Sequence, residues 1–73
     1  MEVYSLTETT GNAGCFGVFS SVEKATAKAM EFIKLWKYGN TEETAFDGFH
    51  KYIYYGEDVN AGCFEIWRHK LDD

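Results

Sequence analysis

The chain has 73 residues, of which seven are Lys or Arg and twelve are Asp or Glu, so its formal net charge is -5. With 45% hydrophobic and 18% aromatic residues it is too apolar for a disordered chain, and it is too short for two domains. We therefore expect residues 1–73 to form a single domain. The scattered basic residues argue against nucleic-acid binding, because neutralised phosphates supply most of that affinity.

The expected location follows from two missing features. No apolar run approaches the roughly 20 residues that cross a bilayer. The first residues contain neither the basic nor the apolar region of a signal peptide. Two cysteines without an export signal are typical of reduced thiols. We therefore expect a cytoplasmic protein with no membrane contact.

Two short strands are expected in the first 19 residues. In the first, Val3 to Glu8, alternation places Tyr4 and Leu6 on one face, and in the second, Cys15 to Phe19, it places Phe16 and Val18 together. The Thr-, Gly- and Asn-rich residues 9–14 are typical of a connecting loop.

A helix follows these strands. Ser20 and Glu23 match a capping box in which Ser20 is the N-cap. Apolar residues then recur at steps of three and four, forming one stripe: Val22, Ala25, Ala29, Phe32, Ile33 and Trp36. Gly39 is expected to end the helix, because glycine tolerates the positive φ of a helix C-terminus.

The second half of the chain predicts two more strands. Residues 40–48 could form a brief helical turn capped at Asn40, and strands are expected at 50–55 and 63–70 with a long loop between them. The order strand, strand, helix, strand, strand predicts an α+β fold, ββαββ, with an antiparallel sheet and one main helix packed on one face. The strand order in this sheet stays open.

Alternation divides the strand residues between two faces. The face toward the helix is expected to hold Tyr4, Leu6, Phe16, Val18, Ile53, Phe64 and Ile66. The opposite face is expected to hold Val3, Cys15, Phe19, Tyr52, Tyr54, Cys63, Trp67 and His69. An exposed aromatic patch of this kind is typical of protein interfaces. We predict Tyr52, Tyr54, Trp67 and His69 as partner-binding residues, unless the sheet curls or residues 40–49 fold back over them.

The pentapeptide Asn-Ala-Gly-Cys-Phe occurs at residues 12–16 and again at 60–64. The simpler interpretation is a shared geometry, in which Asn and Gly form a turn and Phe enters the core. The alternative is a pair of equivalent loops that form one site. The needs of a turn and of the core explain most of the five residues, so we favour the interpretation of a shared geometry.

The sequence gives little support for a catalytic or a metal-binding site. Cys15, Cys63, His50 and His69 have the right composition for zinc, but their spacing fits no short zinc motif. A Cys–His pair would lack a third group, and no glycine pattern matches a phosphate-binding loop. We therefore predict no enzyme activity, no metal, no cofactor and two free, buried cysteines.

The stretch from Gly17 to Ala25, Gly-Val-Phe-Ser-Ser-Val-Glu-Lys-Ala, resembles small uncharacterised proteins of phages and mobile elements. That resemblance covers the first half of the chain and implies a small protein that binds and inhibits a host protein, such as a defence nuclease or a polymerase, in the host cytoplasm. Two alternatives stay open: a structural homodimer whose sheet faces pack together, and an acidic decoy for a DNA-binding protein.

Overall fold

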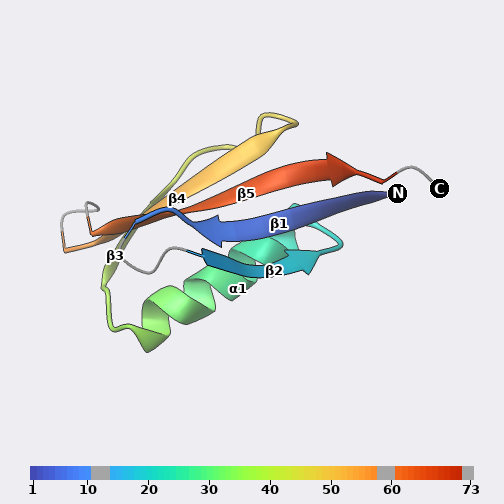
Figure 1. The fold of residues 1–73 in the computed structure, drawn as a ribbon. Helices are drawn as coiled ribbons and strands as arrows, with labels where there is room; N and C mark the ends of the chain where they lie inside the picture. Colours follow the sequence, from blue (N-terminus) through green and yellow to red (C-terminus); the bar gives the residue numbers. More distant parts are fainter. Residues whose placement is uncertain (11–13, 58–60, 72–73) are drawn as a thin grey trace.

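A five-stranded antiparallel sheet with one helix on one of its faces forms the fold in the computed structural model, which describes residues 1–10, 14–57 and 61–71 (Figure 1). In chain order the elements are β1 (Glu2–Glu8), β2 (Gly14–Phe19), α1 (Val22–Leu35), β3 (Asn40–Glu43), β4 (His50–Gly56) and β5 (Gly62–Lys70). The expected α+β class and the single main helix are confirmed. None of the described residues belongs to a helix long and apolar enough to cross a membrane.

The strands lie in the order β2-β1-β5-β4-β3, and every neighbouring pair is antiparallel. The middle strand is therefore β5, which lies between β1 and β4 and is in register with β1 from Glu2 opposite Lys70 to Glu8 opposite Phe64. The short strands β2 and β3 form the two edges.

The prediction of a helical turn that starts at Asn40 is wrong, and the sheet therefore has five strands instead of the four predicted. Residues 40–43 are extended and pair with β4 from Gly56 to Ile53. Glu43 also forms an ion pair with Lys51 Nζ at 2.7 Å, and Asn40 Nδ2 donates to the carbonyl of Glu57. Pairing with β4 satisfies the backbone of this segment, which outweighs the weak local preference for a helical start.

Helix α1 starts one residue later than expected. Ser21, not Ser20, is the N-cap, because its hydroxyl accepts from the backbone N–H of Lys24 at 3.1 Å. The Ser20 hydroxyl instead accepts from Lys24 Nζ at 3.0 Å. At the other end Lys37, not Gly39, takes positive φ (65°), and Tyr38 N–H donates to the carbonyl of Ile33 at 3.1 Å. With the bond from Lys37 N–H to the carbonyl of Lys34 at 3.0 Å, this bond forms a Schellman motif.

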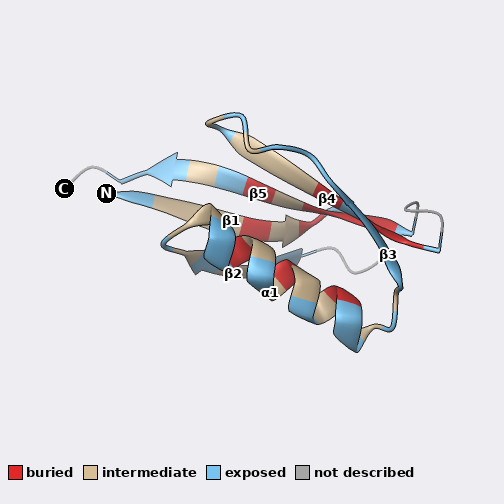
Figure 2. Cartoon of the chain, turned by 180° about the vertical axis from the view of Figure 1, so that it is seen from behind, coloured by how far each residue is buried: buried red, intermediate tan, exposed pale blue. Residues whose placement is uncertain are grey.

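The hydrophobic core lies between α1 and the sheet (Figure 2). Small residues on the helix allow close approach to larger side chains on the strands. The fully buried members are Leu6, Ala25, Ala29, Ile33, Ile53, Tyr55, Phe64 and Ile66. Trp36 at the helix end stacks on Phe64 with ring centroids 5.7 Å apart and planes at 11°.

Two residues of β2 lie on the opposite faces from those expected. The register of β1 and β2 shifts between Leu6 and Thr7, which marks a bulge. Phe19 consequently sits opposite Tyr4 and packs on the core, whereas Val18 is 60% exposed. Simple alternation cannot anticipate an extra residue in a strand.

A buried carboxylate joins three elements beside the core. Glu8 is 2% exposed, and its carboxylate accepts hydrogen bonds from the Tyr55 hydroxyl at 2.8 Å and from the Thr10 hydroxyl at 2.6 Å. Gly62 packs against the same two hydroxyls, and a Cβ on it would collide with them. This cluster fixes the end of β1 against the start of β5.

The repeated pentapeptides meet in the core. Phe16 and Phe64, their last residues, contact each other edge to face. Gly14 has positive φ, whereas Gly62 is confined by its neighbours. Residues 12, 13 and 60 lie outside the described residues. The described parts agree with a structural role for the repeat, since Phe64 belongs to the core and Phe16 packs against it.

Candidate functional site

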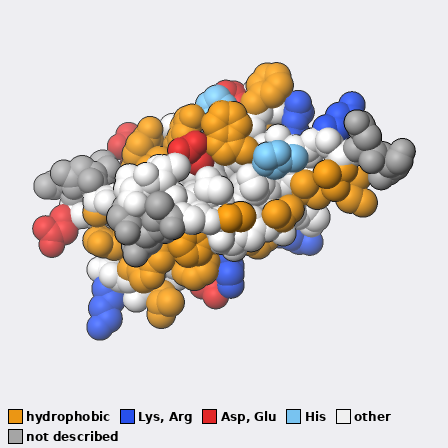
Figure 3. All heavy atoms as spheres, in the orientation of Figure 1, with side chains coloured by type: hydrophobic (Ala, Val, Ile, Leu, Met, Phe, Trp, Pro, Cys, Tyr) orange, Lys and Arg blue, Asp and Glu red, His pale blue; other side chains and the backbone are white. Residues whose placement is uncertain are grey.

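The sheet surface opposite α1 carries the predicted aromatic residues, and we call it the open face. It is formed by the side chains that alternate away from the helix on the three strands β1, β5 and β4, with Glu42 on β3 and Val18 and Cys15 on β2. Tyr54 and Trp67 are each 38% exposed there. Figure 3 shows this face, with hydrophobic side chains and histidine gathered over β4 and β5.

Four rings on the open face contact one another in a row. His50 lies opposite Trp67 in the strand register, and their rings stack with centroids 4.9 Å apart and planes at 30°. The Tyr52 ring contacts the His50 ring, with centroids 4.9 Å apart and planes at 60°. The Tyr54 ring comes next in the row, with its centroid 6.3 Å from that of Tyr52. The three residues of β4 project on one side because they are two positions apart.

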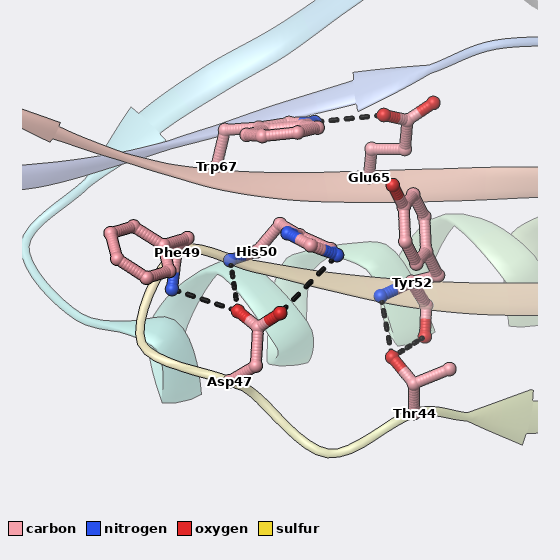
Figure 4. A network of polar contacts seen from close by, with 7 residues as sticks. All are labelled: Thr44, Asp47, Phe49, His50, Tyr52, Glu65 and Trp67. Carbon is pink, nitrogen blue, oxygen red and sulfur yellow. Dashed lines mark hydrogen bonds and ion pairs between the residues drawn. The ribbon is translucent and has the colours of Figure 1, made fainter.

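Polar contacts hold Trp67 and His50 in place (Figure 4). Trp67 Nε1 donates to Glu65 Oε1 at 2.7 Å. Asp47 Oδ1 accepts from the backbone N–H groups of Phe49 and His50, both at 2.9 Å, and Asp47 Oδ2 lies 3.4 Å from His50 Nε2. The backbone donors of His50 and then Phe49 stabilise the carboxylate and lower the pKa of Asp47 below its ordinary value.

Tyr52 is fixed through its backbone. Its N–H donates to the Thr44 hydroxyl at 2.9 Å, and its carbonyl accepts from the Thr44 N–H at 3.0 Å. Partial burial and the nearby Glu65 carboxylate raise the pKa of the Tyr52 phenol, because both disfavour its ionised form.

The structure brings Tyr52, Tyr54 and Trp67 together, as the alternation predicted, but sets His69 apart. His69 Nε2 lies 2.8 Å from Ser5 Oγ, and its backbone pairs with Val3 near the sheet end. His50 replaces it in the ring cluster. The alternation His50-x-Tyr52-x-Tyr54 is the sequence signal that places His50 on this face.

Residues 40–49 do not cover the open face. Phe46 packs on the other side of the sheet, where its ring lies 5.9 Å from that of Tyr4. Phe49, 63% exposed, lies beside Arg68, whose guanidinium sits 5.0 Å from the ring centroid. Phe46 thus lies on the helix side of the sheet, and Tyr54 and Trp67 keep exposed surface on the open face.

The thiols and carboxylates do not assemble a reactive centre in the described part of the chain. Three or more His, Cys, Asp or Glu residues do not gather there into a metal-binding group. Both cysteines are free, Cys63 buried as expected but Cys15 exposed, and β1 lies between their strands. Burial raises the pKa of the Cys63 thiol, which reduces its nucleophilicity at neutral pH.

A second surface lies on the helix. Glu31, Phe32, Lys34 and Leu35 line a shallow, mostly apolar hollow of about 310 Å³. Leu35 is 70% exposed there. This hollow has a single element as its wall and contains no cluster of rings, so the open face is the better candidate site.

Comparisons of the chain with protein-family models, with curated proteins and with solved structures found no match. The site is therefore interpreted from its own geometry. It offers flat aromatic surface, carboxylates and histidine in a fixed arrangement, which suits recognition by contact.

Proposed function

We propose that this chain is a non-enzymatic protein-binding module whose open face captures a partner protein. The observation that carries the proposal is the ring cluster of His50, Tyr52, Tyr54 and Trp67, held by neighbouring polar groups while Tyr54 and Trp67 stay partly exposed. Rigid Tyr and Trp side chains supply large contact areas at low entropic cost, and they are enriched among residues that dominate binding energy.

A finer form of the proposal is that the partner is a host protein and the chain its phage-encoded inhibitor. Its support is the resemblance in residues 17–25, which lie at β2 and the start of α1 and do not form the ring cluster. The inhibitor role thus depends on the setting that the resemblance implies, whereas the binding role depends on the open face.

A pull-down from bacterial lysate tests the binding role. The tagged wild type is compared with a Tyr54→Ala/Trp67→Ala variant, and with Leu35→Ala, which removes an exposed apolar side chain from the helix. We expect a protein that is captured by wild type and by Leu35→Ala but lost with the double variant. Circular dichroism and thermal unfolding establish that the double variant is folded. Equal capture by all three proteins would refute the proposed site.

A further inference from the structure

Charge is distributed unequally between the two sides of the sheet. All seven basic side chains belong to the helix side: three on α1, one directly after it, and three on strand positions that alternate toward the helix. They are Lys24, Lys28, Lys34, Lys37, Lys51, Arg68 and Lys70. Figure 3 agrees, with Lys and Arg side chains lying around the rim of the open face rather than over its centre.

Three acidic residues on the helix side, Glu2, Glu31 and Glu43, have basic partners. Glu43 pairs with Lys51 at 2.7 Å, and Glu31 pairs with Lys28 at 3.6 Å. By contrast, Glu42 and Glu65 on the open face form no ion pair with any described residue. Glu65 uses Oε1 to accept from Trp67 Nε1.

These two carboxylates flank the tyrosines of β4. Glu65 on β5 lies directly opposite Tyr52, and Glu42 on β3 lies directly opposite Tyr54. Each tyrosine thus has an acidic residue as its cross-strand neighbour, one on either side of β4. The centre of the open face therefore combines aromatic rings with negative charge that the chain itself does not neutralise.

From this juxtaposition we infer that the open face recognises an arginine-bearing segment of its partner. This inference rests on the proposed binding function. A guanidinium group stacks on Tyr or Trp and at the same time donates paired hydrogen bonds to a carboxylate, whereas Lys offers only a point charge. Tyr54 with Glu42, and Tyr52 and Trp67 with Glu65, supply both halves of that recognition.

The same charges disfavour two other occupants. A second copy of the chain packed face to face would place the acidic patch of Glu42 and Glu65 against the same patch of the other copy, because a two-fold interface uses one surface twice. Nucleic-acid phosphates would meet these carboxylates without any Lys or Arg over the centre of the face. An arginine-bearing segment has neither conflict.

Calorimetric titration with defined peptides tests the inference. The probes are a Gly/Ser peptide carrying several arginines and the same peptide with citrulline, which keeps the planar shape but removes the charge. The proteins are wild type, Glu42→Gln/Glu65→Gln, and the control Glu31→Gln, which removes a paired charge on the helix. The Gln side chain at position 65 retains an oxygen that accepts from Trp67.

We expect the wild type to bind the arginine peptide about tenfold or more tightly than the citrulline peptide, as for charge-assisted hydrogen bonds. The Glu42→Gln/Glu65→Gln variant should lose this preference, and Glu31→Gln should keep it. Equal binding of both peptides by wild type would overturn the inference, as would equal losses in the double variant and in Glu31→Gln. A lysate partner that is lost with Tyr54→Ala/Trp67→Ala but retained by Glu42→Gln/Glu65→Gln would overturn it while leaving the proposed function intact.

Discussion

Phe16 and Phe64 meet edge to face in the core, with ring centroids 5.6 Å apart and planes at 71°. Each ends one copy of the repeated pentapeptide, so the two copies contact each other through their largest residue. Phe64 is fully buried and also contacts Trp36 and Tyr55. The described part of the repeat therefore contributes to stability through its two phenylalanines.

Phe64→Ala is expected to lower the free energy of unfolding by about 3–5 kcal/mol, because it leaves a cavity among several rings. Phe49→Ala is the matched control. Its ring is 63% exposed and its contact with Arg68 is worth at most about 1 kcal/mol. Urea unfolding followed by fluorescence measures both. Similar losses for the two variants would contradict the placement of Phe64 at the core centre.

Gly62→Ala should destabilise the chain by about 1–3 kcal/mol, because the added methyl group would lie 2.5 Å from Thr10 Oγ1 and against the Tyr55 hydroxyl. Gly39→Ala serves as the control, since a Cβ there meets nothing within 4 Å. Thermal unfolding of the two variants gives the comparison. A Gly62→Ala protein as stable as Gly39→Ala would show that the Glu8 cluster tolerates displacement.

The two serines at the start of α1 should differ in importance. Ser21→Ala removes the acceptor for Lys24 N–H and is expected to cost about 1 kcal/mol. Ser20→Ala removes only an exposed contact with the Lys24 ammonium, so we expect little change. The midpoints of urea unfolding of the two variants measure the difference. A larger loss of stability for Ser20→Ala than for Ser21→Ala would place the cap at Ser20.

The ionisation of Asp47 should make the stability of the chain depend on pH. Its pKa in the folded chain lies below the ordinary 3.8, so folding favours the ionised carboxylate. That contribution is fully present above the unfolded pKa and is lost as pH falls through the folded pKa. Asp47→Asn keeps an acceptor oxygen but no charge. Wild type should be the more stable above about pH 5, and the difference should shrink toward about pH 2. A difference independent of pH would exclude this contribution.

The cysteines should react at different rates. Cys15 is exposed, whereas Cys63 is buried and the pKa of its thiol is raised by that burial. Iodoacetamide at neutral pH should therefore label one thiol in the native chain and two after unfolding. Mass spectrometry of the labelled peptides identifies the sites. Rapid native labelling of Cys63 would show that its end of β5 opens readily.

Local patterns in the sequence predicted the elements with strong periodicity. The apolar stripe of α1 and the alternation of Tyr52, Tyr54 and Trp67 were sufficient to place the helix and the aromatic face. Pairing partners are not local, however. β3 forms because Asn40–Glu43 lies along β4, and the bulge in β2 depends on its register with β1.

The buried carboxylate illustrates the same limit. Glu8 at the end of a strand suggests a solvated charge, and only its contact with Tyr55, 47 residues later, explains its burial. Likewise, the unpaired state of Glu42 and Glu65 depends on which face each basic residue occupies. Charge counts alone could not reveal that separation.

The pairing of β1 with the middle strand β5 has a consequence for how the chain folds. These strands lie at opposite ends of the sequence, so their pairing forms only after almost the whole chain has been closed into one loop. Such non-local pairing slows folding relative to helical proteins of similar size. During synthesis, the hairpin of β1 and β2 with α1 emerges first but lacks its neighbour, and the sheet is completed only when β5 leaves the ribosome.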